Sequence, residues 1–402
     1  MVSNIADRKA LSQELPSQQD GSIDTLVQEL RQTILDHIDA IGLNNSEAGE
    51  SNSRLSKNQI RTIHAAHRRE TAQREAKMVG DHGQRLLNHF AEGSEVGVEA
   101  IDPELVLVDP DTEEANLFRI AALLWSVPVS RGFGRRMRFL VRDRSNQKLI
   151  GLLALGSPVF NLSPRDNWIG WTVRDREERL VNVMDAFVIG AVPPYSQLIG
   201  GKLVAALIGS GEVSQHFERR YGLKRGIISG KLKRAKLVLV TTTSALGHSS
   251  LYNRLRLPGL IEFHRLGTTN GWGHFQVPDS IFNQMRRLLE LGGHKYASGY
   301  RYGDGPNWRL RVAREALERI GLDGNVMRHG IRREVYGVPL TENWREYLLG
   351  EDDDAILERP TVKEIADACI ERWLLPRSKR RPQFRAWKRG DTWRLITQAI
   401  EP

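Results

Sequence analysis

The 402-residue sequence contains one cysteine, Cys369, and no long apolar run. One cysteine cannot form a disulfide within the chain or supply a cysteine-based zinc cluster. The longest run of apolar residues and glycine covers residues 149–156, far short of the roughly 20 residues of a membrane-spanning helix. The first residues, MVSNIADRK, lack the apolar stretch of a signal peptide. We therefore expect a cytoplasmic protein that does not bind a membrane.

Basic residues outnumber acidic ones. The chain has 58 Lys and Arg against 49 Asp and Glu, a formal net charge of +9, together with nine tryptophans. Lys and Arg on a packed surface attract phosphate groups, so a polyanion such as nucleic acid is the expected partner. With 40% of its residues hydrophobic, the chain can bury sizeable cores, and its length suits two or three domains.

The pattern of apolar residues changes twice along the chain. Spacings of three or four predict a helix over residues 20–43, and a polar helical segment follows at 57–90 after a Ser-, Asn- and Gly-rich linker at 44–53. In the second helical segment we expect His64, His67, Arg68, Arg69 and Arg74 to be exposed to solvent or to a partner. Strands are predicted, from β-branched and aliphatic runs, over residues 136–143, 148–156, 167–173, 183–192 and 235–244. Helices are predicted over residues 114–125, 200–222, 281–291, 308–320, 341–349 and 362–373.

This order of elements predicts an α/β protein in three parts. They are a helical N-terminal arm (residues 1–97), an α/β domain (98–280) and a basic, mainly helical C-terminal region (281–402).

The C-terminal segment 377–389, RSKRRPQFRAWKR, has seven basic residues and no acidic one. Such a segment can neutralise phosphates, and its aromatic rings can stack on bases. The candidates for nucleic-acid contact here are Lys379, Arg380, Arg381, Trp387 and Lys388. The alternative is a solubilising tail.

Other arginines, a lysine and a tryptophan extend the expected nucleic-acid surface. Trp272 lies in the glycine-containing loop TNGWGH, which suits stacking on a nucleotide or capping a core. The phosphate-contact candidates are Arg135, Arg136, Arg138, Arg165, Lys202, Arg309, Arg311, Arg332 and Arg333. Some of them are expected to pair with nearby glutamates instead.

A turn after the strand predicted at 183–192 carries further information. Pro193 and Pro194 end the strand, and Gly200 and Gly201 open a helix whose first N–H groups can hold an anion, with Lys202 adding a charge. Close packing of the helix on the sheet is the alternative.

This turn resembles the acetyl-CoA site of the GNAT acyltransferases, where a Gln/Arg-x-x-Gly-x-Gly/Ala turn cradles pyrophosphate. Gln197 and Gly200 match that pattern, whereas Lys202 replaces its last small residue. The stretch 241–259 is similar to the final GNAT motif, and Tyr252 stands at the position where that family often has a proton-donating tyrosine. The resemblance implies a GNAT-like central mixed sheet and leaves acyl-CoA binding as one alternative function.

Three carboxylates are candidates for catalysis. If Asp166, Asp185 and Glu212 converged in one pocket, they could hold Mg²⁺ for phosphoryl transfer, with His248 or His274 near by. The alternative is that Asp166 is a turn residue bonded to the preceding arginine and Asp185 caps the start of a strand.

A longer resemblance covers residues 118–387. Blocks such as GRRMRFLVRD, MDAFVIGAVPPY, TTTSALGHSSLYNRL and ERWLLPRSKRRP resemble the DruA family of the Druantia anti-phage defence systems, which is related to proteins of bacterial mobile elements. The resemblance implies a cytoplasmic component of a multi-protein bacterial defence, acting beside a large helicase-like partner.

Together these observations predict a defence protein that binds DNA through a basic surface. Metal-dependent DNA cleavage or strand transfer, which would require Mg²⁺, is the first alternative. A GNAT-type acyl-CoA-binding protein is the second.

Overall fold

The computed structural model describes residues 18–41, 55–130, 133–225, 230, 232–273, 277–299, 306–327, 329–356 and 358–401. The chain forms two compact units, each assembled from separate segments. One unit combines Met1–Ser46 with Asp279–Val326, and the other combines Glu47–Pro278 with Met327–Pro402. This division differs from the three consecutive parts expected from the sequence. The linker expected at 44–53 lies outside the described residues.

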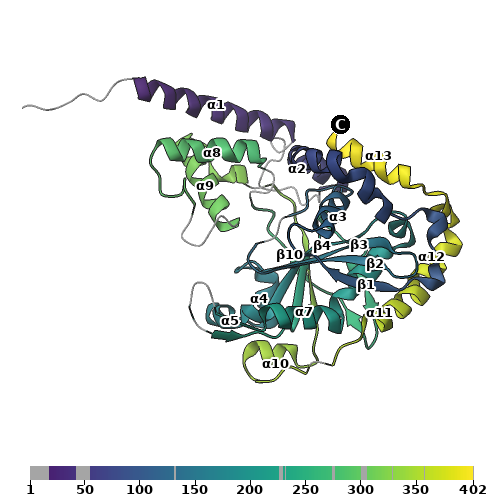
Figure 1. Cartoon of the computed structure of the whole chain (residues 1–402). Coiled ribbons are helices and arrows are strands. Elements are labelled where there is room, and N and C mark those ends of the chain that lie inside the picture. Colours follow the sequence, from purple (N-terminus) through teal and green to yellow (C-terminus); the bar gives the residue numbers. More distant parts are fainter. Residues whose placement is uncertain are drawn as a thin grey trace, which may run out of the picture. The chain divides into compact units, whose positions relative to one another are not determined.

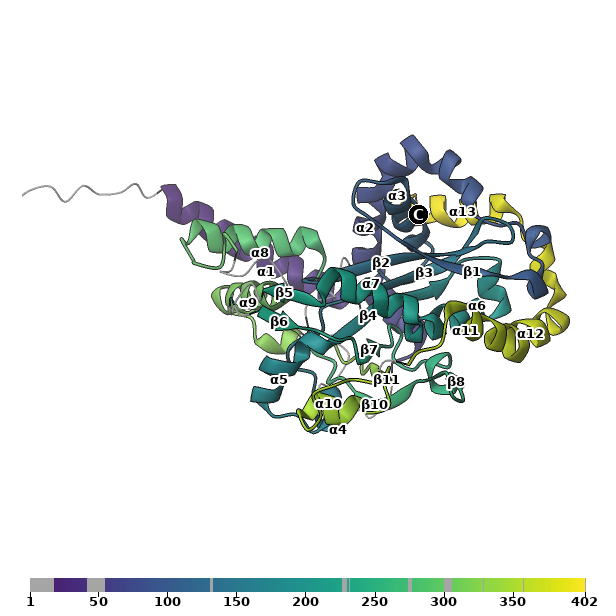
Figure 2. The same ribbon diagram turned by 60° about the horizontal axis from the view of Figure 1, so that its bottom comes forward.

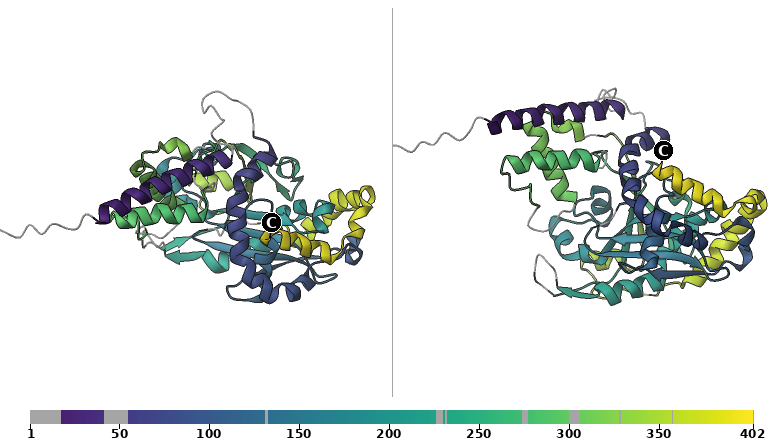
Figure 3. Two further views of the ribbon diagram at one scale, coloured as in Figure 1. Left: turned by 90° about the horizontal axis from the view of Figure 1, so that it is seen from above. Right: turned by 45° about the horizontal axis from the view of Figure 1, so that its top comes forward.

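The smaller unit is helical. It contains α1 (Gln18–Ala40), α8 (Asp279–Leu291) and α9 (Pro306–Arg319). Figures 1 and 3 show α1 running beside α8, and Leu30 and Ile34 of α1 are buried. Arg31 fixes α1 to the end of α9, because its Nη1 donates to the carbonyl oxygens of Ile320 (2.7 Å) and Gly321 (2.9 Å).

A seven-stranded mixed sheet forms the centre of the larger unit, in the order β1-β2-β3-β4-β7-β11-β10. Its strands are β1 (Pro103–Leu107), β2 (Arg136–Asp143), β3 (Lys148–Gly156), β4 (Val183–Ala191), β7 (Leu239–Thr243), β10 (His264–Thr268) and β11 (Glu334–Pro339). Two short ribbons pair β5 (Leu223–Arg225) with β6 (Leu232–Arg234), and β8 (Arg256–Leu257) with β9 (Ile261–Glu262).

One strand pair of this sheet, β4 and β7, is parallel, and it ends early. Its last paired residues are Asp185 and Thr241. Beyond them, β4 continues beside β3 as far as Ala191, and β7 continues beside β11 as far as Thr243. The two strands therefore separate within the sheet, and this opening positions the candidate site.

Helices cover both faces of the sheet (Figures 1 and 2). On one face, α2 (Lys57–Leu86), α3 (Glu113–Ala122) and α13 (Arg389–Ile400) pack on Leu140 and Leu152. On the other, α6 (Gly200–Ala206), α7 (Gly211–Tyr221) and α11 (Val362–Cys369) pack on Phe139 and Leu153. The alternation of residues along β2 and β3 thus gives each face its own core.

Shorter helices complete the larger unit. They are α4 (Ser163–Ile169), α5 (Val173–Arg179), α10 (Trp344–Leu349), a π-helical turn (Ile370–Leu374) and α12 (Leu375–Arg380). The single-turn 3₁₀ helices are Leu87–His89, Gly93–Glu95, Val98–Ala100, Leu180–Asn182, Tyr195–Leu198, Leu207–Gly209, Tyr252–Arg254, Gly324–Met327 and Pro382–Ala386. In the described ranges, no helix has both the length and the apolar composition needed to cross a membrane.

The structure confirms the α/β class and corrects several details. The strand predicted at 167–173 is wrong, because Gly170, at φ 97°, ends α4 and a capping box at Thr172 begins α5. The mainly helical C-terminal region also supplies β11 to the sheet, a strand that the sequence analysis did not predict. His64 is not exposed but buried, because α2 packs on the sheet.

Candidate functional site

A pocket of about 380 Å³ lies where β4 and β7 separate. Asp185 and Phe187 of β4 line it on one side, and Thr243 at the end of β7 lines it on another. Helix α2 contributes His64, and Arg333 comes from the residue before β11. All these residues belong to the larger unit. Segments far apart in the sequence therefore meet here because of the sheet order.

The lining combines apolar surface with groups that form hydrogen bonds. The apolar and aromatic members are Val127, Pro128, Phe133, Val159, Leu162, Ala186, Phe187, Ala245 and Trp272. The hydroxyl members are Ser130, Ser157, Thr243 and Thr269, and the ionisable ones are His64, Asp185, His329 and Arg333. Apolar walls with a few placed polar groups are typical of small-molecule sites.

Asp185 is the acidic group of the pocket. Its Oδ1 accepts a hydrogen bond of 2.8 Å from the hydroxyl of Thr241, the residue opposite it on β7. Burial raises the pKa of Asp185 to about 6, although Thr241 and the nearby Arg165 favour the ionised form. At neutral pH the carboxylate is therefore mostly ionised in a poorly solvated place.

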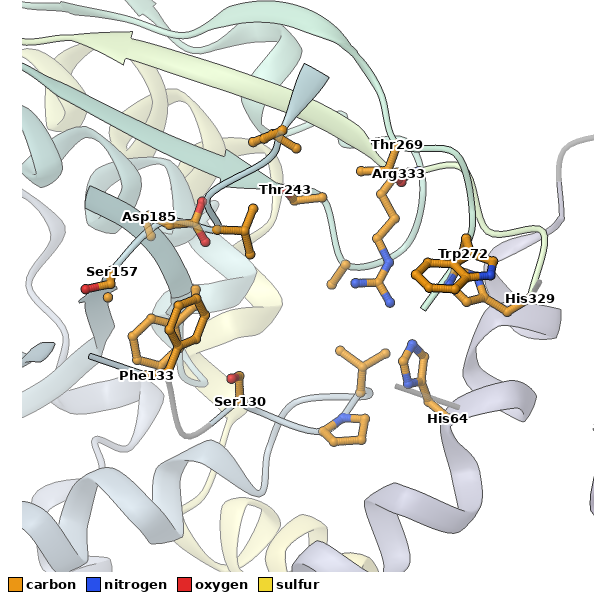
Figure 4. Close-up of a pocket in the computed structure, with 18 residues that line it drawn as sticks. His64, Ser130, Phe133, Ser157, Asp185, Thr243, Thr269, Trp272, His329 and Arg333 are labelled. Carbon is orange, nitrogen blue, oxygen red and sulfur yellow. Dashed lines mark hydrogen bonds between the residues drawn. The ribbon is translucent and has the colours of Figure 1, made fainter. Parts of the chain in front are cut away.

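The opposite wall carries a cation and two histidines (Figure 4). Arg333 extends toward His64, and Trp272 and His329 lie on the same side, whereas Asp185 and Phe133 lie across the pocket. Burial lowers the pKa of Arg333 to about 10, which leaves the guanidinium charged at pH 7. Burial, with the charge of Arg333, lowers the pKa of His64 to about 3, so this imidazole is neutral.

Replacing Asp185 by asparagine is expected to stabilise the protein at pH 8 by up to about 3 kcal/mol. Folding raises the pKa of Asp185 from 3.8 to about 6, so the folded state binds the proton more tightly than the unfolded state. The cost of ionising Asp185 therefore grows from about pH 4 to pH 6 and is complete above pH 6. Urea unfolding of Asp185→Asn and of the unmodified protein at pH 8 and pH 4 measures this difference in stability. The control, Asp353→Asn at an exposed site, should show no such gain, and equal curves for both variants would contradict this role of burial.

Glu334 and His248 form a second polar cluster, built by β11 and the loop after β7. The carboxylate of Glu334 lies 2.9 Å from His248 Nδ1 and accepts hydrogen bonds from the hydroxyl of Tyr336 (2.5 Å) and from Arg265 Nε (2.9 Å). Burial opposes its ionisation, but these donors and the Ser249 N–H lower the pKa of Glu334 to about 2. Glu334 is therefore a fixed anion that orients His248.

Arg165 and Asp166 form a buried ion pair in α4. Arg165 Nε donates to Asp166 Oδ1 at 2.8 Å, and its Nη atoms donate to the carbonyl oxygens of Val159 (2.9 Å) and Phe160 (2.8 Å). Asp166 Oδ2 also accepts from Arg176 at 2.8 Å. The side chain of Arg165 is 0% exposed, so its charge serves the fold rather than a surface phosphate.

The three carboxylates proposed to hold a metal have separate partners. Asp166 is paired with two arginines, Asp185 faces the pocket, and Glu212 accepts the N–H of Val362 at the start of α11 (3.0 Å). The charge of Arg165 favours the ionised form of Asp185, although burial raises the pKa of Asp185 overall. Within the described parts of the chain, no three His, Cys, Asp or Glu side chains are grouped to hold a metal ion.

Two other residues of the expected catalytic set have different outcomes. Tyr252 is stacked on Phe263, and burial raises its pKa to about 12, with Asp185 adding to the rise. His274 lies outside the described residues.

The C-terminal basic segment is where exposed cations gather. Lys379 and Arg380 end α12, Arg381 follows, and Arg385 lies in the next 3₁₀ helix; all four are exposed. No carboxylate pairs with these four side chains in the part of the chain described here. We refer to Lys379, Arg380, Arg381 and Arg385 as the basic cluster.

The remaining residues of this segment are tied to the fold. Lys388 Nζ lies 3.4 Å from Glu92, Arg389 pairs with Glu95 at 2.9 Å, and Trp387 Nε1 donates to the hydroxyl of Thr392 at 2.9 Å. The basic cluster therefore stands on a segment that is itself anchored.

Several other predicted phosphate contacts are engaged inside the larger unit. Arg135 donates to the carbonyl oxygens of Val181 (2.5 Å) and Val183 (2.9 Å), and Arg138 lies over the ring of Phe118. Lys202 is buried, with Nζ 4.2 Å from the centre of the Trp373 ring. Arg136 and Arg332 are exposed.

The smaller unit holds two of the predicted phosphate contacts. Arg309 pairs with Asp279 at 3.0 Å, and Arg311, which is exposed, has its guanidinium 5.9 Å from the centre of the Tyr296 ring.

The turn with a GNAT-like pattern shows close packing. Every residue of α6 is buried, and a Cβ on Gly200 would come within 2.7 Å of the carbonyl oxygen of Tyr195. A Cβ on Gly201 would lie 2.9 Å from Leu251. Packing against the backbone therefore requires glycine at position 200, whereas at position 201 the Leu251 side chain would have to shift.

The sequence analysis did not predict that Glu334 holds a polar cluster together or that His64 and His329 line the pocket. Glu334 stands in a run of arginines, where it was expected only to neutralise them. The spacing of β7 and β11 in the sequence gives no sign that they are neighbours. A prediction of β11 as a strand beside β7 would have brought Arg333, Glu334 and His248 together.

Comparisons with known proteins agree over most of the chain. The family described as Druantia protein DruA matches residues 54–350, which include the pocket. The Druantia protein DruA of Escherichia coli (strain UMEA 4076-1) is 45% identical over 371 residues, covering 92% of each chain. No solved structure matches, so the GNAT-like character of the sheet stays a prediction. DruA is a component of the Druantia anti-phage system, and this chain belongs to the DruA family.

Proposed function

We propose that this protein binds DNA in anti-phage defence, through the basic cluster. The observation that carries the proposal is the gathering of Lys379, Arg380, Arg381 and Arg385 on one anchored segment without carboxylate partners among the described residues. Cations that are not neutralised within the protein attract a polyanion and release its counterions on binding.

The anchoring of the segment favours a specific surface over a solubilising tail. Arg377 Nε donates to the carbonyl oxygen of Gln197 at 3.1 Å, and Phe384 is buried. The ion pair of Arg389 with Glu95 holds the far end. A fixed array of charges loses less side-chain and backbone freedom on binding than a mobile tail does.

Single-stranded DNA displaced during defence is the proposed ligand. The family resemblance implies a helicase-like partner, whose action would supply such strands. Lys and Arg contacts to phosphates carry no sequence information, so we expect affinity to depend on backbone charge and little on sequence.

The triple variant Lys379→Ala/Arg380→Ala/Arg381→Ala tests this proposal. Because three phosphate contacts are removed, we expect roughly tenfold or greater loss of affinity for labelled single-stranded DNA at low salt, measured by fluorescence anisotropy. All sequences should be weakened similarly.

A matched control removes the same net charge elsewhere. The variant Arg174→Ala/Arg219→Ala/Lys363→Ala takes three exposed cations from α5, α7 and α11. It should bind DNA nearly as the unmodified protein does. Equal losses in both variants would show that only total charge matters, and that the basic cluster is not a site.

A further inference from the structure

We infer that the pocket between β4 and β7 binds a nucleotide, that is, a nucleobase with an attached phosphate group. This site is separate from the basic cluster, and the inference goes beyond DNA binding there. The argument comes from the charges, the aromatic rings and the volume of the pocket.

The charged groups stand on different walls. Arg333 and Asp185 both line the pocket, and Figure 4 shows them apart, with the guanidinium near His64 and Asp185 across the pocket, on the side of Phe133 and Ser157. A guanidinium is a bidentate donor to phosphate oxygens, whereas a carboxylate accepts hydrogen bonds from the amino and imino groups of a base or from sugar hydroxyls. One ligand with an anionic end and a donor-bearing end satisfies both groups.

The residues around Arg333 support the assignment of the ligand's phosphate group to this side of the pocket. Its main chain is held by hydrogen bonds with Thr269, whose N–H donates to Arg333 O at 2.9 Å and whose hydroxyl accepts from Arg333 N at 3.1 Å. His64 stays neutral at this position and can donate or accept a hydrogen bond without adding charge. The main chain that carries Arg333 is therefore held in place at the cationic end of the pocket.

Aromatic surface suits the base. Trp272 lines the pocket and is 42% exposed, an unusual exposure for a large indole ring, and Phe133 and Phe187 line it as well. Stacking of a base on such a ring contributes to binding whatever the base. The pocket volume of about 380 Å³ falls within the range of about 300–1,000 Å³ seen for small-molecule sites.

Other small ligands fit less well. An apolar molecule would displace water from the carboxylate of Asp185 and the guanidinium of Arg333 without supplying hydrogen bonds in its place, which is costly. A bare phosphate would engage Arg333 but would make no contact that uses the aromatic rings or Asp185. A nucleotide engages all three kinds of group.

Calorimetric titration of the full chain with AMP, GMP, CMP and dTMP tests the inference, with adenosine and inorganic phosphate as part-ligands. We expect at least one mononucleotide to bind with a dissociation constant below roughly 1 mM, at least tenfold tighter than either part-ligand.

Variants of the pocket residues test the parts of the site separately. Trp272→Ala should weaken binding of that mononucleotide by roughly tenfold. Arg333→Lys should weaken binding of the mononucleotide more than binding of its nucleoside, so that their affinities become more similar. Thermal unfolding shows whether each variant is folded, and Trp272→Phe, which keeps a ring, should restore most of the affinity.

A second arm distinguishes a free nucleotide from a nucleotide unit of a strand. A 5′-phosphorylated trinucleotide is titrated into the unmodified protein and into Trp272→Ala. Tighter, Trp272-dependent binding of the trinucleotide identifies a strand as the source, and equal affinities identify the free nucleotide. If no mononucleotide or trinucleotide binds in a Trp272-dependent way at millimolar concentration, the inference is overturned. The basic-cluster triple variant should bind the mononucleotide normally, so failure of the pocket and failure of DNA binding are distinguishable.

Discussion

Replacing Asp166 by alanine is expected to lower the free energy of unfolding by about 3–5 kcal/mol. The reason is that Arg165 is fully buried and Asp166 is its carboxylate partner. Removing Asp166 leaves a buried guanidinium with its charge uncompensated, and also frees Arg176 from its 2.8 Å contact. Urea unfolding of the full chain, followed by tryptophan fluorescence, measures the change.

A surface ion pair provides the control. Asp354 is 92% exposed and pairs with Lys236 at 2.9 Å, so Asp354→Ala should cost less than about 1 kcal/mol. The comparison also separates a structural role of Asp166 from a catalytic one. An Asp166→Ala protein as stable as Asp354→Ala, yet unable to support defence against phage, would contradict the structural role.

Replacing Glu334 by glutamine is expected to cost up to about 3 kcal/mol at pH 7. The pKa of Glu334 falls from 4.5 to about 2 on folding, because its donors outweigh the opposing effect of burial. The ionised group therefore stabilises the fold above about pH 4.5, and this contribution is lost as the pH falls toward 2.

Urea unfolding at pH 7, 5 and 3 gives the profile. The difference between Glu334→Gln and the unmodified protein should be constant at pH 7 and 5 and smaller at pH 3. Glu262→Gln, at a 41% exposed carboxylate paired with Arg256, serves as the control and should show a small difference throughout. A loss in Glu334→Gln that did not change with pH would show that packing, rather than charge, is the cause.

Strands with a clear apolar pattern could be predicted from the sequence. The ranges 136–143 and 148–156 agree with β2 and β3, because both strands are long and supply buried residues to two cores. The stretch 167–173 misled because its tryptophans and valine have high strand propensity. Local capping decided its structure, since Gly170 ends one helix and Thr172 starts the next.

The site was predictable only in part. Asp185 and Arg333 stand out as ionisable residues beside strands, but their meeting depends on the order of strands in the sheet. Exposure was the larger difficulty, because a sequence does not show which arginines are buried. Arg135 and Arg165 turned out to bind carbonyl oxygens and a carboxylate, whereas Arg380 and Arg381 are exposed.

The salt dependence of DNA binding tests the central claim most directly. Affinity for single-stranded DNA is measured between low and moderate salt for the unmodified protein and for the Lys379/Arg380/Arg381 triple alanine variant. Each phosphate contact contributes about 0.7 to the slope of log affinity against log salt, so the triple variant should have a slope shallower by about 2. A flat response of the unmodified protein, or identical slopes for the two, would contradict binding through the basic cluster.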